Sequence, residues 1–117
     1  MKNESILVKK ADEFAFEVYK ISKNFPKDEI YGLTSQMRRA ALSVPLNAIE
    51  GFSRNNKKEY KRFLEISYGS LKETKYLLHF AHRENYLNTL EYQKLLNLAD
   101  ELGKIIWSAI QTLKQNQ

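Results

Sequence analysis

NKKEYKRFLEISYGSLKETKYLLHFAHRE, residues 56–84, carries the clearest structural signal in this chain. Apolar and small residues recur along it every three or four positions, which is the spacing of one face of an α-helix. Asn56, followed three residues later by Glu59, is typical of a capping box and predicts a helix over 57–84. The expected inward face of this helix consists of Tyr60, Phe63, Leu64, Ser67, Leu71, Thr74, Leu78 and Ala81.

Similar signals downstream predict a last helix over 89–114. Asn88 and Glu91 repeat the capping pattern after a short break at 85–88, and apolar residues then recur at helical spacing. The expected buried face consists of Leu95, Leu98, Ala99, Leu102, Ile105, Ile106, Ala109 and Leu113.

Two further helices are predicted upstream. Thr34 or Ser35 can cap a helix over 35–51, which we expect to be kinked at Pro45 because proline removes one backbone hydrogen bond. A first helix is predicted over 5–23 and should stop before Phe25-Pro26, since a residue that precedes proline avoids helical geometry. The expected inward residues are Leu7, Ala11, Phe14, Val18 and Ser22 in the first helix and Met37, Ala41, Val44 and Ala48 in the second.

The connections between these helices indicate the fold class. The first connection is longer and the other two are short, which is typical of neighbouring antiparallel helices. The sequence therefore predicts an all-α fold, an antiparallel up-down four-helix bundle that forms one domain over 1–117.

Apolar residues also occur behind the expected inward faces. The helix over 35–51 has a second apolar group nearly opposite the first, and the outer side of the last helix carries Leu96, Gly103, Trp107 and Ile110. Gly69 costs about 1 kcal/mol relative to alanine inside a helix unless another backbone lies close. These faces predict a homo-oligomer, although a broad, kinked bundle could instead bury them within one subunit. The candidate interface residues are Leu42, Leu46, Ile49, Ile66, Gly69, Tyr76, Phe80 and Trp107.

The net charge of the chain is localised. Seven of its 19 basic residues lie within 34–62 against only Glu50 and Glu59, so this stretch accounts for the whole formal net charge of +5. Clustered basic side chains favour a polyanionic partner and predict binding of RNA or DNA through phosphates. The candidate nucleic-acid-binding residues are Arg54, Lys57, Lys58, Lys61, Arg62, Arg38 and Arg39.

Two alternatives to phosphate binding remain open. The basic cluster can be a solvated face on an oligomeric scaffold whose partner is a protein. Arg38 and Arg39 flank the second apolar group of their helix, so they can serve an interface or line a central opening instead of the outside.

The composition argues against several classes of protein. The chain has no cysteine, which excludes thiolate zinc sites and leaves no trace of an oxidising compartment. It has neither an apolar run of signal-peptide length at its start nor the roughly 20 apolar residues of a membrane span. We therefore expect a cytoplasmic protein that does not associate with membranes.

The residue patterns do not indicate catalysis. His79 and His82 are three residues apart, a spacing that can place two imidazoles on one metal, but no third ligand is evident. Glu50 lies close to Arg54 in sequence, which favours a structural ion pair over a general base. Glycine-rich phosphate loops and nucleophile motifs are missing. The sequence predicts no enzyme, no cofactor, no metal and no small-molecule substrate.

Several longer motifs resemble a known family. They are the run YGLTSQMRRAALSVP at 31–45, then Asn47 and Glu50-Gly51, and finally Phe63-Leu64-x-x-Ser67-x-Gly69-Ser70-Leu71-x-Glu73. In this order they resemble the four-helix bundle proteins encoded in intervening sequences of bacterial 23S ribosomal RNA genes. The resemblance spans nearly the whole chain.

This resemblance implies a homopentameric barrel of four-helix bundles with no established catalytic activity. A related protein is the accessory variability determinant of diversity-generating retroelements, a basic pentamer that associates with nucleic acid and a reverse transcriptase. The resemblance thus implies a pentamer and a nucleic-acid partner, in agreement with the outward apolar groups and the localised charge.

Overall fold

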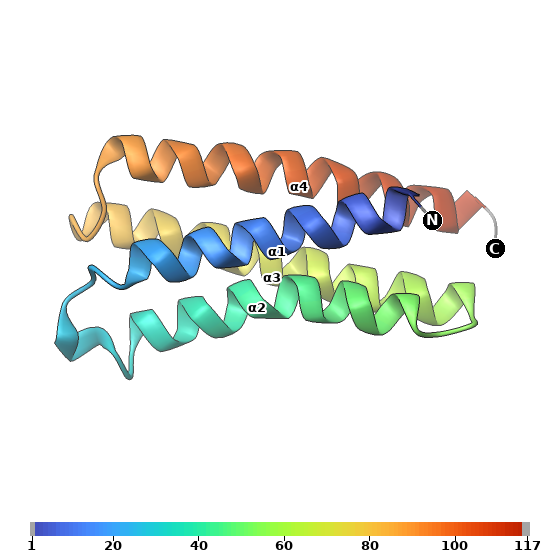
Figure 1. Cartoon of the computed structure of the whole chain (residues 1–117), viewed down its shortest axis with the longest axis horizontal. Helices are drawn as coiled ribbons and strands as arrows, with labels where there is room; N and C mark the ends of the chain where they lie inside the picture. The colour runs from blue at the N-terminus through green and yellow to red at the C-terminus, as the bar shows by residue number, and fades with distance from the viewer. Residues whose placement is uncertain (1, 116–117) are drawn as a thin grey trace.

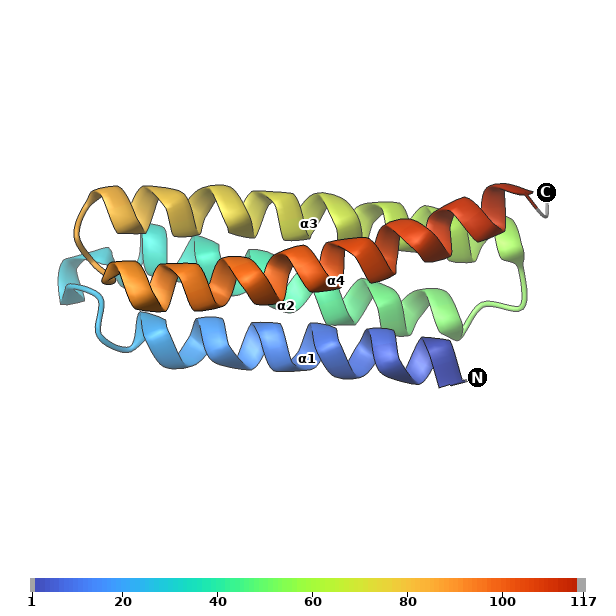
Figure 2. The ribbon, with the colours of Figure 1, turned by 90° about the horizontal axis from the view of Figure 1, so that it is seen from above.

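The four predicted helices form an antiparallel bundle in the computed structural model, which describes residues 2–115 (Figure 1). The elements are α1 (Lys2–Ser22), a 3-10 turn η1 (Lys27–Glu29), α2 (Leu33–Phe52), α3 (Lys57–Arg83) and α4 (Thr89–Gln115). The bundle is 45 Å long and 25 by 19 Å across. Its up-down course places the α2–α3 turn at the same end as the start of α1 and the end of α4 (Figures 1 and 2).

Each helix packs against two neighbours. α1 and α3 each contact α2 and α4, and α2 and α3 form the most extensive pair. The buried residues of α2 include Ala40, Ala41, Ala48 and Gly51. Their small side chains allow neighbouring helices to lie close to α2. α2 continues as one helix through Pro45, and its ribbon changes direction near the middle (Figure 1).

The predicted inward residues form the core. All nine of those expected in the first two helices are buried. In α3 and α4, Tyr60, Phe63, Leu98, Ile105 and Ala109 are partly exposed at the margin, and the other expected residues are buried. The prediction was wrong for Ile110, which is only 3% exposed. It follows Ile106 by four residues, so it shares the inward stripe of α4.

The cap expected for α2 was also wrong. α2 begins at Leu33 after Gly32, and no side chain at that N-cap position forms a hydrogen bond. Instead Glu29, in η1, accepts a hydrogen bond from the Leu33 N–H at 3.2 Å. The hydroxyl of Thr34 is buried and has no hydrogen-bond partner among the described residues. A carboxylate from the preceding turn therefore accepts a hydrogen bond from a backbone N–H at the start of α2 that has no partner within the helix.

The caps expected at Asn56 and Asn88 are confirmed to different degrees. Asn56 accepts from the Glu59 N–H at 3.0 Å, but the Glu59 carboxylate binds Arg62 instead of completing the box. Asn88 and Glu91 form both reciprocal hydrogen bonds, each at 2.8 Å. Between α3 and α4, Asn85 adopts a left-handed conformation with φ of 63°, which ends α3.

Glu29 is itself held by a residue distant in sequence. The hydroxyl of Tyr86 donates to its second carboxylate oxygen at 2.8 Å, and the Tyr86 ring packs on Phe25. This hydrogen bond raises the pKa of Tyr86 from 10.0 to about 12, with burial adding to the shift. One interaction therefore ties the α3–α4 turn to the start of α2.

The Tyr86 hydrogen bond should give stability that is lost in strong alkali. Because the native state holds the proton more tightly than the unfolded chain, the contribution is fully present below pH 10 and disappears between about pH 10 and 12. We expect Tyr86→Phe to lower the melting temperature at neutral pH and the difference from the parent to shrink above pH 10. Tyr31→Phe, at a fully exposed ring, is the control. A difference that stays constant up to pH 12 would contradict this assignment.

Gly51 lies at a close contact between α2 and α3. A Cβ there would lie 2.8 Å from Cδ1 of Tyr60 and 3.2 Å from Cβ of Phe63, so alanine must push the helices apart. We expect Gly51→Ala to lower the free energy of unfolding by about 1–3 kcal/mol in urea denaturation. Gly103→Ala is the matched control, because its Cβ meets only Leu71 at 3.5 Å. The free energy of unfolding of that variant should rise by up to about 1 kcal/mol, because alanine favours the helix more than glycine does. If both substitutions changed the free energy of unfolding in the same direction, the steric argument would be refuted.

Candidate nucleic-acid interface and subunit surfaces

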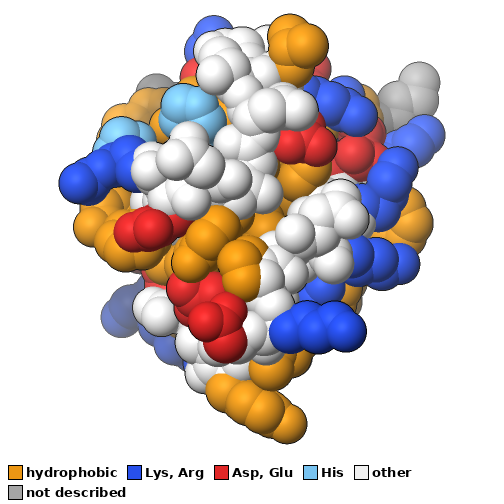
Figure 3. All heavy atoms as spheres, turned by 90° about the vertical axis from the view of Figure 1, so that its left-hand side faces the viewer, with side chains coloured by type: hydrophobic (Ala, Val, Ile, Leu, Met, Phe, Trp, Pro, Cys, Tyr) orange, Lys and Arg blue, Asp and Glu red, His pale blue; other side chains and the backbone are white. Residues whose placement is uncertain are grey.

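Five of the predicted basic residues gather at the α2–α3 turn and the first two turns of α3. We call this group, Arg54, Lys57, Lys58, Lys61 and Arg62, the turn patch. It lies at the end of the bundle that also holds the start of α1 (Figure 1). At the opposite end, which holds η1 and the α3–α4 turn, acidic, basic and hydrophobic side chains are mixed (Figure 3).

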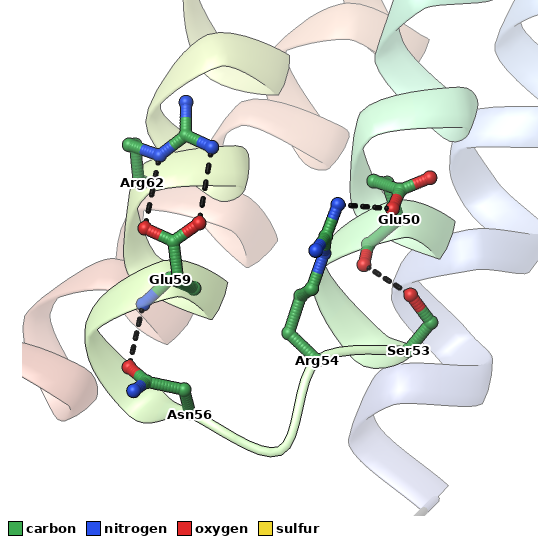
Figure 4. A network of polar contacts seen from close by, with 6 residues as sticks. All are labelled: Glu50, Ser53, Arg54, Asn56, Glu59 and Arg62. Atoms are coloured by element: carbon green, nitrogen blue, oxygen red, sulfur yellow. Dashed lines mark hydrogen bonds and ion pairs between the residues drawn. The ribbon is translucent and has the colours of Figure 1, made fainter.

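Carboxylates neutralise part of the turn patch. Arg54 bonds Glu50 at 2.7 Å, and Arg62 makes two hydrogen bonds to Glu59, at 3.1 and 3.2 Å (Figure 4). Lys61 pairs more loosely with Glu65, at 3.4 Å. Sequence analysis counted Glu50 and Glu59 in the net charge and predicted the Glu50–Arg54 pair. It did not predict the pairs of Arg62 with Glu59 and Lys61 with Glu65, although spacings of three and four residues on a helix favour them.

The remaining two cations of the turn patch are less constrained. Lys57 and Lys58 are exposed, and neither forms an ion pair with a carboxylate in the described part of the chain. They are the first two residues of α3, where backbone N–H groups lack helical partners. These two lysines are therefore the most available cations of the turn patch.

The arginines of the turn patch are held in place from two sides. The guanidinium groups of Arg54 and Arg62 lie over the ring of Phe63, 5.2 and 4.5 Å from its centroid. The hydrogen bonds from Arg62 lower the pKa of Glu59, and the same contact raises the pKa of Arg62. Glu50 takes part in the ion pair predicted for it, with Arg54.

The structure separates Arg38 and Arg39 from the turn patch. They lie about 20 Å away along α2, at 1.5 Å per residue. Arg38 donates to the Ser22 hydroxyl of α1 at 2.8 Å, and its guanidinium lies over the Tyr19 ring at 4.8 Å. Arg39 is exposed and bonds Ser35 on its own helix. Arg38 thus links α2 to α1, and the two arginines form no continuous cluster with the turn patch.

The eight predicted interface residues are all exposed in the single chain. A Cβ at Gly69 would meet nothing within 4 Å. The exposed fractions of the side chains range from 37% for Phe80 to 60% for Leu46. The alternative that a broad bundle buries these residues within one subunit therefore does not hold for the described chain. Of the other outer residues on α4, Leu96 and Gly103 are partly exposed.

The predicted interface residues of α2 and those of α3 lie on two different sides of the bundle. Leu42 and Ile49 lie within about 40° of Arg38 around α2, and Arg38 contacts α1. On α3, Gly69 and Tyr76 point about 160–180° away from the buried Ser67. We call the first group, Leu42, Leu46 and Ile49, the α2 face and the second group, Ile66, Gly69, Tyr76 and Phe80, the α3 face.

Trp107 belongs to neither face. Its ring lies beside Tyr68 of α3, with 5.7 Å between the ring centroids, in a groove between α3 and α4 that is flanked by lysines. Sequence analysis did not find this groove, because its residues come from two helices whose register only the fold reveals.

The two histidines contact the same aromatic ring. His82 stacks on Tyr92 at 4.5 Å between centroids and lies 3.2 Å from the Thr89 hydroxyl, and His79 lies 3.4 Å from the Tyr92 hydroxyl. Among the described side chains, residues 6–115, no three His, Asp or Glu are grouped so that they could hold a metal ion. None of the described helices has the length and apolar character needed to cross a membrane.

Comparisons with known proteins agree with this architecture. A family model described as 23S rRNA-intervening sequence protein matches residues 3–108. No curated protein matches the chain. Among solved structures, the chain is similar to a protein with unknown function from the S23 ribosomal protein family of Bacteroides thetaiotaomicron VPI-5482. The TM-score is 0.86 at 22% identity, over 93% of this chain and 98% of that chain. At this identity the likeness establishes the fold and no activity.

Proposed function

Because the chain belongs to the 23S rRNA-intervening sequence protein family, we propose that it is a cytoplasmic, non-catalytic homo-oligomer that binds RNA or DNA through phosphate contacts. The observation that carries this proposal is the pair of exposed lysines, Lys57 and Lys58, at the N-terminus of α3. Both are free of carboxylate ion pairs among the described residues. The positive end of the helix adds to their field.

The carboxylates in the turn patch do not prevent phosphate binding. Arg54 and Arg62 are about half exposed, as are their partners. Ion pairs between exposed side chains contribute only about 0–1 kcal/mol, so a phosphate can replace a carboxylate at little cost. Phe63 holds both guanidinium groups close to the α3 N-terminus during that exchange.

The α2 face and the α3 face support the oligomer. Because the two faces are unlike and lie on different sides of the bundle, contact between them joins one copy to the next in a head-to-tail manner. Such contacts close into a ring when the rotation between neighbours allows it, and the family resemblance implies a ring of five. Each ring would then repeat the turn patch once per subunit and multiply its phosphate contacts.

Binding to nucleic acid tests the function directly. The parent protein should bind structured RNA or duplex DNA at about 50 mM salt, and its affinity should fall steeply with rising salt as counterions are released. It should discriminate poorly between sequences, since phosphate contacts do not read bases. If neither nucleic acid shows salt-sensitive binding, the turn patch is a solvated face and the protein acts as a scaffold for a protein partner.

A further inference from the structure

A second charged surface of the bundle is the groove between α3 and α4 that contains Trp107. It has a volume of about 430 Å³, within the range of small-ligand sites. Its floor is apolar, and Gly103 leaves room over Leu71 because no side chain projects there. The lining residues that carry the argument are Tyr68, Lys72, Lys75, Asp100, Gly103 and Lys104, together with Trp107.

The charges of this groove are less compensated than those of the turn patch. Lys75 bonds Asp100 at 2.8 Å, which accounts for one positive and one negative charge. Lys72 and Lys104 are exposed and form no ion pair with the described side chains of residues 6–115, although the Lys72 ammonium lies 5.4 Å from the Tyr68 ring centroid. Two cations thus remain available on opposite helices of one groove.

Trp107 supplies a flat apolar surface between these cations. It is 50% exposed, and its ring is braced against Tyr68 at an interplanar angle of 41°. Lysines are depleted from the cores of protein–protein interfaces, so a half-exposed tryptophan among lysines is an unusual subunit contact. An aromatic ring flanked by cations is instead the arrangement that binds unpaired nucleotides, because bases stack while phosphates meet the cations.

We propose that the α3–α4 groove binds an unpaired nucleotide, with its base stacked on Trp107 and its phosphate held by Lys72 and Lys104. The polar pair Lys75–Asp100 offers one donor and one acceptor to the edge of the base. A base inside a duplex cannot stack there, because both of its faces are already covered. The site differs from the turn patch in its residues, its helices and the form of nucleic acid that it accepts.

Trp107 reports directly on this site, because it is the only tryptophan in the chain. Titration with single-stranded oligouridine of about ten nucleotides should quench its fluorescence to a saturable end point at about 50 mM salt. A parallel titration with uridine monophosphate shows whether the ligand is a single strand or a free nucleotide. Tighter binding of the oligonucleotide assigns a strand as the ligand, and equal binding per nucleotide assigns a free nucleotide.

Variants place the ligand within the groove. The double substitution Lys72→Gln and Lys104→Gln should weaken binding, measured by quenching, by about tenfold or more, since the two lysines together hold the phosphate. Gly103→Leu should block it by filling the floor without changing any charge. Lys9→Gln, at an exposed lysine on α1, is the control and should leave quenching unchanged. Trp107→Leu, followed by anisotropy of a labelled strand, should lose roughly 5- to 150-fold in affinity, the range for one stacked base.

Two results would overturn the proposal. One is the absence of quenching by both ligands, and the other is quenching that the groove variants leave unchanged while circular dichroism shows them to be folded. The outcome is independent of the turn patch, because removing the turn-patch cations should leave Trp107 quenching by uridine monophosphate intact. Conversely, the groove variants should leave duplex DNA binding intact.

Discussion

Replacing Gly69 by leucine is expected to dissociate the assembly into monomers while each four-helix bundle stays folded. The single chain leaves open space around this position, so a larger side chain meets nothing within its own subunit. A subunit interface across the α3 face would instead place a neighbour where the leucine projects. Forcing additional carbon atoms into a well-packed contact costs about 1–3 kcal/mol per site. A ring repeats that cost at every interface.

Light scattering measures this effect. The parent should have a mass several times the 13.8 kDa of one chain, and Gly69→Leu should approach that of the monomer with an unchanged helical circular dichroism spectrum. Ser108→Leu adds a similar side chain at an exposed position on α4 and should leave the assembly intact. A parent that is monomeric at tens of micromolar would refute the oligomer itself. An unchanged mass for Gly69→Leu would show that this glycine faces solvent.

The helices could be predicted from the sequence because their signals are local. Caps such as Asn88 with Glu91, and apolar residues every three or four positions, depend only on neighbours within a few residues. The start of α2 could not, because its cap depends on Glu29, which Tyr86 holds from 57 residues further along the chain. Local patterns contain no information about that pairing.

The candidate sites could be predicted only in part, for two different physical reasons. The turn patch was recognisable as a run of basic residues, and its ion pairs, such as Arg62 with Glu59, were also present in the helical spacing. Naming all five turn-patch residues as phosphate-binding without assigning these pairs overestimated the number of free cations. The α3–α4 groove depends on the register between Tyr68 and Trp107, which are 39 positions apart. Only the packed bundle places them together.

Replacing all five turn-patch residues by glutamine is expected to remove most of the salt-dependent affinity for structured RNA or duplex DNA. On duplex DNA, the slope of log affinity against log salt falls by about 0.9 for each phosphate that the protein no longer neutralises. Three such phosphates per subunit, multiplied by the copies in a ring, would change the slope well beyond experimental error. The fold should survive, because these side chains lie at the surface of the α2–α3 turn and the first turns of α3.

A control with the same net charge separates position from total charge. Glutamine at five exposed lysines elsewhere lowers the net charge by the same amount and should retain most of the affinity and slope of the parent. These control positions are Lys9, Lys20, Lys23, Lys27 and Lys114. If both variants lose affinity equally, the binding follows the overall charge of the protein and the turn patch is not a site.

A single substitution that should raise the affinity for nucleic acid makes the same test sharper. Glu59→Gln removes the carboxylate that holds Arg62 through two hydrogen bonds, so it frees a guanidinium for phosphate and adds one positive charge to the turn patch. We expect affinity for duplex DNA to rise severalfold. The slope of log affinity against log salt should steepen by about 0.9, the change for one additional phosphate contact. Asn56 still caps α3, because it accepts from the backbone of residue 59 and not from its side chain. Unchanged affinity would mean that Arg62 does not meet phosphate, and the proposed interface would shrink to the lysines at the start of α3.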